Sequence, residues 1–119
     1  MVPTYYDLEP AYKDDAYGPV IIRVKSSVSG GTYLDFSDCS EICLQARNKK
    51  NKAIVLEWRY SAGQISILDN FYISLHRKTH SEMAMPAGEY IYDLQVTLSG
   101  YKTTYMSGKI KVFEDVTRF

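Results

Sequence analysis

GEYIYDLQVT at residues 88–97 is the stretch of this sequence that decides the fold. Every second residue from Tyr90 to Val96 is apolar, which is the period of a β-strand with one buried face. Ser99-Gly100 follows as a two-residue turn, and Tyr101–Phe113 returns with apolar residues alternating again near its end. The stretch therefore predicts a long β-hairpin.

Shorter strand-like runs fill the chain before this hairpin. Most of them alternate apolar and polar residues, and turn residues separate one from the next. Several short strands at such regular spacing, with almost no helix, are typical of an antiparallel β-sandwich. We therefore expect an all-β fold, a single immunoglobulin-like antiparallel β-sandwich. The runs are Val20–Lys25, which ends at a turn at 29–31, Ile42–Arg47, Ala53–Tyr60, Gly63–Leu68 and Phe71–Leu75.

Thr79-His80-Ser81-Glu82 has the pattern of a capping box at a helix N-terminus. In such a box the hydroxyl and the carboxylate each accept from the other residue's backbone amide. Pro86 prevents the segment from continuing. The sequence predicts one short helical turn at 81–85.

Residues 1–18 differ from the rest of the chain in composition. They carry four acidic residues against one lysine, a net charge of −3, which leaves +3 for residues 19–119. They also contain Pro3 and Pro10 and show neither a strand nor a helix period. We expect an extended N-terminal arm at 1–18 and an immunoglobulin-like domain at 19–119.

Tyrosine is frequent in this arm, which holds four of the 11 tyrosines. Disordered segments are poor in aromatic residues, whereas tyrosine is a favoured anchor at interfaces. We predict that the arm packs on a neighbouring protein or a second copy, and that a chain lacking residues 1–17 keeps its sandwich folded. The predicted partner-binding residues are Tyr5, Tyr6, Tyr12 and Tyr17.

Charge and hydropathy exclude several classes of partner. The chain has 14 basic and 14 acidic residues, without the basic excess of a general nucleic-acid binder. The basic turn at 47–52 lacks the interleaved aromatic residues of a nucleic-acid platform. No apolar run approaches the roughly 20 residues that span a bilayer, and the N-terminus lacks the pattern of a signal peptide. We expect a soluble intracellular product with no nucleic-acid or membrane partner.

Two cysteines and two histidines raise the question of a metal site. Cys39 and Cys43 are four residues apart, as are His76 and His80, so a Cys2His2 zinc site is conceivable by count. However, His76 ends a strand-like run and His80 opens a turn, and residues four apart share a face only on a helix. We expect free thiols, no metal and no cofactor.

The sequence contains the residue types of two kinds of catalytic site, but no motif that places them together. Ser74, His76 and Asp69 supply the residue types of a nucleophilic triad, but no nucleophile elbow surrounds any serine. A glycosidase pair would have to come from Glu57, Glu89 or Asp93, in a chain too small for a deep cleft. We expect that the protein is not an enzyme and has no small-molecule substrate.

Carbohydrate binding is a third class to weigh. Trp58 is the only tryptophan and alternates with Leu56 and Tyr60. A lone strand tryptophan in a sandwich is more often a core residue than a sugar platform.

A succession of short stretches carries a family resemblance: ISIL at 65–68, the turn at 79–85, PAGEYIYDLQVT at 86–97, SGKIKV at 107–112 and EDVTR at 114–118. This succession resembles a family of small proteins of tailed bacteriophages and prophages. The resemblance covers residues 19 to 118, and its specific part is 86–118. It also extends to the N-terminal, virion-attached domain of upper baseplate and receptor-binding tail proteins. The arm at 1–18 is not part of the pattern.

The resemblance implies a structural role. Such proteins are β-sandwich modules that sit in multiple copies on the tail, baseplate, neck or capsid and dock other virion proteins such as fibres. This chain would then be made in the host bacterial cytoplasm and located in the virion, as a tail, baseplate or neck adaptor. The alternatives are a capsid decoration protein and, less favoured, a carbohydrate-binding β-sandwich module.

Overall fold

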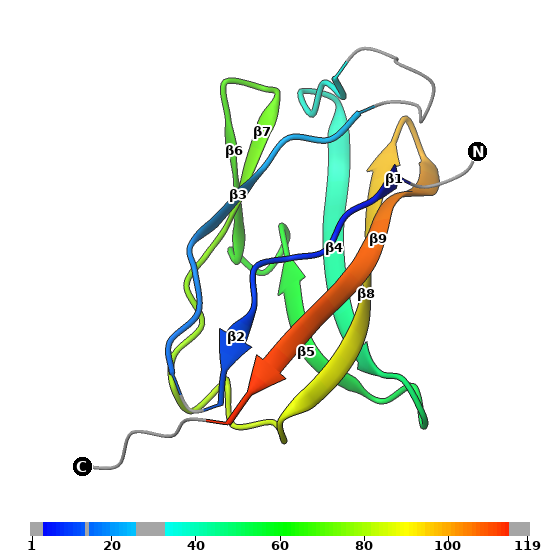
Figure 1. The fold of residues 1–119 in the computed structure, drawn as a ribbon. Helices are drawn as coiled ribbons and strands as arrows, with labels where there is room; N and C mark the ends of the chain where they lie inside the picture. Colours follow the sequence, from blue (N-terminus) through cyan, green and yellow to red (C-terminus); the bar gives the residue numbers. More distant parts are fainter. Residues whose placement is uncertain (1–3, 14, 26–32, 115–119) are drawn as a thin grey trace.

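The long C-terminal hairpin is the centre of the fold, and Figure 1 shows it as the yellow and orange pair β8 and β9. The structure is a computed structural model that describes residues 4–13, 15–25 and 33–114. None of these residues forms a helix able to cross a membrane. The strands are β1 (Thr4–Tyr5), β2 (Ala11–Tyr12), β3 (Val20–Ile22), β4 (Cys39–Asn48), β5 (Ile54–Arg59), β6 (Ile65–Leu68), β7 (Tyr72–Leu75), β8 (Gly88–Leu98) and β9 (Tyr101–Phe113).

Two sheets make up the described part of the chain. The larger sheet has the order β1-β9-β8-β4-β5, with β2 also pairing with β9, and the smaller sheet has the order β3-β7-β6. Pairing is antiparallel except where β1 and β2 run parallel to β9. The predicted all-β, immunoglobulin-like sandwich is confirmed.

The predicted hairpins form around tight turns. Ser99 and Gly100 between β8 and β9 have φ values of 51° and 83°, and Asp69 and Asn70 between β6 and β7 have 51° and 63°. Two consecutive positive φ values characterise the type I′ turn, whose twist matches that of the paired strands. The turn predicted at 29–31 lies outside the described residues.

The core lies between the two sheets and follows the alternation in the sequence. Trp58 from β5 is 1% exposed. The smaller sheet contributes Ile22, Ile73 and Leu75 to this core, and all three are buried. Inward positions of β4 and β8 are also buried: Ile42, Leu44, Ala46, Tyr90, Tyr92, Leu94 and Val96.

The helical turn predicted at 81–85 is wrong. The capping contacts do form, because the Thr79 amide donates to Glu82 Oε1 at 2.9 Å and the Glu82 amide reaches Thr79 Oγ1 at 3.4 Å. They close only hydrogen-bonded turns, in which the Met83 amide donates to the Thr79 carbonyl at 3.2 Å. Met83 and Met85 are buried in the core, so tertiary packing ends the segment before a helix forms.

The N-terminal arm is held by its own chain, which corrects the prediction that its order comes from a partner. It pairs with the C-terminal half of β9 (dark blue and orange in Figure 1), and the amides of Tyr6, Leu8 and Lys13 donate to β9 carbonyls at 2.8 to 2.9 Å. Leu8 and Ala11 are buried in the common core. Sequence periodicity missed these strands because each has only two residues.

A buried lysine fastens the end of the arm. Lys78 is 5% exposed, and its ammonium donates to the Glu57 carbonyl at 2.6 Å and lies 5.0 Å from the centre of the Trp58 ring. The Lys78 and Tyr17 backbones bond each other in both directions, at 2.8 and 2.9 Å. The arm, β5 and the turn before β8 are therefore tied together at one place.

Candidate functional site

The four tyrosines predicted to bind a partner lie in different environments. Tyr6 and Tyr12 are 55% and 52% exposed, and the Tyr12 ring lies 5.7 Å from the ring of Phe113. For Tyr5 the backbone is described, in β1, but the side chain lies outside the described part. Tyr6 and Tyr12 therefore remain candidates for contact with a partner.

Tyr17 is a correction to that prediction. Its side chain is 6% exposed and packs beside Trp58, with ring centres 6.3 Å apart. Its hydroxyl donates to the Glu9 carbonyl at 2.7 Å. Tyr17 is thus a core residue that closes the arm onto the sandwich, and its surface is not available to a partner.

The buried Tyr17 hydroxyl makes stability sensitive to alkaline pH. Burial, and then the nearby charge of Glu9, raise the pKa of Tyr17 above its usual value. Because the folded state holds this proton more tightly than the unfolded state, the free energy of unfolding should fall as pH rises above about 10. Tyr17→Phe should cost about 1 kcal/mol at pH 7 and flatten this alkaline decline.

Chemical unfolding between pH 7 and 11 measures the effect, with Tyr12→Phe as the control for an exposed tyrosine. An alkaline decline as steep in Tyr17→Phe as in the parent would contradict the assignment.

A groove of about 500 Å³ lies between the arm and β3, with Met106 of β9 also among its lining residues. Buried apolar side chains from the arm, β3, the residues after it and β9 line its floor: Leu8, Ile22, Val24 and Met106. Tyr6, Ile21 and Tyr33 are exposed around it, and Ile21 is 62% exposed. The groove therefore combines an apolar floor with an apolar rim.

Arg23 stands at the rim of this groove in a fixed position. Its guanidinium lies 3.3 Å from the centre of the Tyr33 ring and donates to the Tyr72 hydroxyl at 2.7 Å. These two tyrosines raise the pKa of Arg23, with the Tyr72 hydrogen bond first. The side chain is exposed, so its remaining donors face solvent beside the groove.

Sequence reasoning missed this groove, although one signal was present. Within Val20–Lys25 the solvent-facing positions hold Ile21, Arg23 and Lys25, and an isoleucine is out of place on that face. The Arg23–Tyr72 contact had no such signal, because the two residues lie 49 positions apart in the chain.

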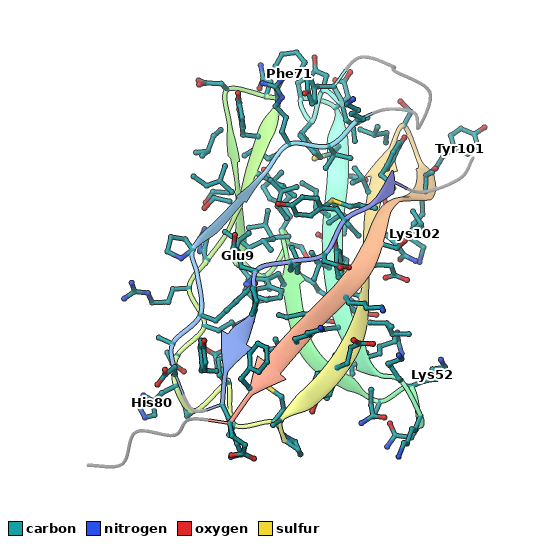
Figure 2. All side chains as sticks on the ribbon, in the orientation of Figure 1. Glu9, Lys52, Phe71, His80, Tyr101 and Lys102 are labelled. Atoms are coloured by element: carbon teal, nitrogen blue, oxygen red, sulfur yellow. The ribbon has the colours of Figure 1, made fainter. Side chains whose placement is uncertain are left out.

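The outer face of the larger sheet is polar. A hollow of about 440 Å³ there is lined by residues of β4, β5, β8 and β9, among them Cys43, Asp93 and Lys102. Lys102 points away from the smaller sheet in Figure 2. Gln45 donates to Glu57 at 2.6 Å, and this bond, followed by that from Arg59, lowers the pKa of the Glu57 carboxyl. The Arg59 guanidinium lies 3.1 Å from Glu57 and 3.8 Å from Glu41, so these three charges are paired on this face.

The two cysteines lie on opposite faces of β4. Cys39 packs against the core, whereas Cys43 faces the polar hollow. His76 follows β7 in the other sheet, and the described residues contain no group of three potential metal ligands. The zinc arrangement considered from the sequence is therefore not assembled.

The Cys43 thiol should react slowly at neutral pH. Burial raises its pKa, although Arg59 opposes the shift. Since the thiolate is the reactive form, the rate with an aromatic disulfide reagent should grow about tenfold per pH unit and keep growing beyond the pKa of free cysteine. Stopped-flow kinetics on Cys39→Ala measures this, with free cysteine as the reference. A rate that levels off near pH 8 would contradict it.

The nucleophilic triad considered from the sequence does not assemble either. Ser66 rather than Ser74 meets His76, with Oγ 2.6 Å from Nε2. Asp69 lies in the turn at the opposite end of β7 from His76. Trp58 donates its indole N–H to the His76 carbonyl at 2.9 Å from within the core, so it cannot be a sugar platform.

Comparisons with known proteins bear on the fold. No protein-family model and no curated protein sequence matches the chain. Among solved structures, CopC from Methylosinus trichosporium OB3b aligns with a TM-score of 0.51 at 10% identity, covering 92% of this chain and 89% of that one. Murine CRIg aligns over 95% of this chain and 93% of its own, at 7% identity and a TM-score of 0.37. The CopC likeness supports the β-sandwich fold and says nothing of activity.

Proposed function

We propose that this protein is a non-enzymatic structural component of a tailed bacteriophage virion, an adaptor of the tail, baseplate or neck that docks other virion proteins such as fibres. It would be made in the host bacterial cytoplasm and act in multiple symmetric copies in the particle.

The exposed apolar surface around the groove is the observation that carries the proposal. Tyr6, Ile21 and Tyr33 gather there beside an edge of the smaller sheet. Large groups of exposed apolar side chains are uncommon on the surface of a monomeric protein, and they typically mark an interaction site. The resemblance of residues 86–118 to phage structural proteins then indicates which kind of assembly would use such a surface.

The ends of the sandwich add further exposed apolar residues. Phe71 at the β6–β7 turn and Tyr101 at the β8–β9 turn lie at the same end of the molecule (Figure 2), and they are 42% and 77% exposed. A module with apolar groups on one side and at one end suits contacts with more than one neighbour.

The experiment that tests the proposal examines purified particles of a phage that encodes this chain. Mass spectrometry should find the protein in stoichiometric amounts, and immunogold labelling should place it on the tail, baseplate or neck. Label on the head surface would favour the capsid decoration alternative. Particles that contain none of the protein would overturn the proposal.

A substitution test in the same particles addresses the arm. Because Tyr6 and Tyr12 are exposed, changing both to serine should leave the fold intact and lower incorporation at least about fivefold. Tyr60→Ser, at an exposed position just after β5, is the control and should leave incorporation unchanged. Equal incorporation of both variants would return the docking role to other surfaces.

A further inference from the structure

We propose that the groove between the arm and β3 binds an extended segment of a partner protein, which adds to β3 as a strand and places an acidic side chain on Arg23. The inference deepens the proposed function and rests on it, because it names the docking site and the chemistry of what docks there.

The backbone of β3 provides the first step. β3 is one of the two edge strands of the smaller sheet and, among the described strands, pairs only with β7. An exposed strand edge is a template for a further strand, and strand addition is a recurrent mode of peptide recognition. Ile21, exposed in the middle of β3, offers an apolar contact to such a strand.

The floor of the groove provides the second step. Leu8, Ile22, Val24 and Met106 are buried apolar residues that line the groove, with Ile22 in β3 of the smaller sheet and Met106 in β9 of the larger one. An added strand would direct every second side chain toward this floor, because side chains alternate along a strand. The segment should therefore carry apolar residues at alternate positions.

The charges provide the third step. Arg23 and Lys25 stand at the groove against the single carboxylate of Glu9. No carboxylate of the described residues forms an ion pair with Arg23, whose guanidinium is already positioned by Tyr33 and Tyr72. A guanidinium held in place loses little entropy when it binds a carboxylate. The positions between the apolar ones should therefore be acidic.

Selection of random dodecapeptides, displayed on yeast, against the purified full chain tests this inference. The enriched peptides should alternate apolar and acidic residues. A synthetic peptide of the most enriched sequence should bind at least about tenfold more weakly to Ile21→Asp and to Arg23→Glu. Arg23→Glu should in turn select peptides with basic residues at the same positions.

Matched controls separate the groove from the general surface. Ile54→Asp changes another exposed isoleucine at the start of β5, and Lys52→Glu reverses a charge in the β4–β5 turn. Both should bind the peptide within about twofold of the parent. Hydrogen exchange of the amides of residues 20–23 should slow when the peptide binds, as strand addition requires.

Several outcomes would overturn the inference: no enriched peptide, enrichment without acidic residues, or binding that Ile21→Asp leaves unchanged. Self-association in analytical ultracentrifugation that Ile21→Asp abolishes would assign the groove to a second copy instead. The peptide experiment does not need the virion. If the protein is incorporated into particles but binds no peptide in the groove, the proposed function stands and the groove inference fails. If it binds peptide in the groove but is absent from particles, the groove inference stands and the proposed function fails.

Discussion

A chain that begins at Gly18 should lose about 5 kcal/mol or more of its free energy of unfolding, because the missing residues contribute to the core. The deletion removes the buried side chains of Leu8, Ala11 and Tyr17. It also exposes the edge of β9, to which the arm donates its backbone hydrogen bonds. Since a small domain has only about 5–15 kcal/mol in total, most of the truncated protein should be unfolded or aggregated.

Guanidinium unfolding and circular dichroism of the full and truncated chains measure this loss. Leu8→Ala should give a smaller loss, about 2–5 kcal/mol, while Tyr12→Ala at an exposed position should stay within about 1 kcal/mol. A truncated chain as stable as the parent would restore the sequence-based expectation that the arm is separable. This result also explains why substitutions, rather than deletion of the arm, are needed to study docking.

The hairpins were predictable because their information is local. In β4 and β8 each buried residue is followed by a half-exposed one, so alternation alone identifies both the strand and its inward face. The turns at Asp69-Asn70 and Ser99-Gly100 add residue types that tolerate positive φ. Local patterns of this kind do not depend on knowing which distant segment packs against them.

The arm and the groove were not predictable because they depend on distant partners. The pairing of β1 and β2 with β9 joins residues about a hundred positions apart. Arg23 likewise meets Tyr72 across 49 positions. One signal for the arm was present nonetheless: Gly108 interrupts β9 where no turn is needed, and an isolated glycine within a strand often marks the close approach of another backbone.

Replacing Gly108 should have the second large effect on stability, and the sign of the change in the free energy of unfolding distinguishes two explanations for this glycine. Gly108 has a backbone conformation open to other residues, so propensity and chain entropy alone predict that Gly108→Ala stabilises the protein by about 0.4–1 kcal/mol. However, a Cβ at this position would lie 2.0 Å from the Tyr6 carbonyl oxygen and 2.6 Å from its carbon. Both are backbone atoms, so the arm itself would have to move.

Gly108→Ala should therefore destabilise the protein by about 2–4 kcal/mol, as overpacking at a rigid contact does. Moving the arm would also break the hydrogen bond that the Tyr92 hydroxyl donates to the Tyr6 carbonyl, and would expose Leu8. Faster hydrogen exchange at the amides of Tyr6 and Leu8 should accompany the loss of stability. Ser107→Ala, one residue earlier in the same strand, is the matched control and should stay within about 0.5 kcal/mol. A Gly108→Ala variant that is more stable than the parent would show that the arm does not pack on β9. The arm would then not form one side of the groove.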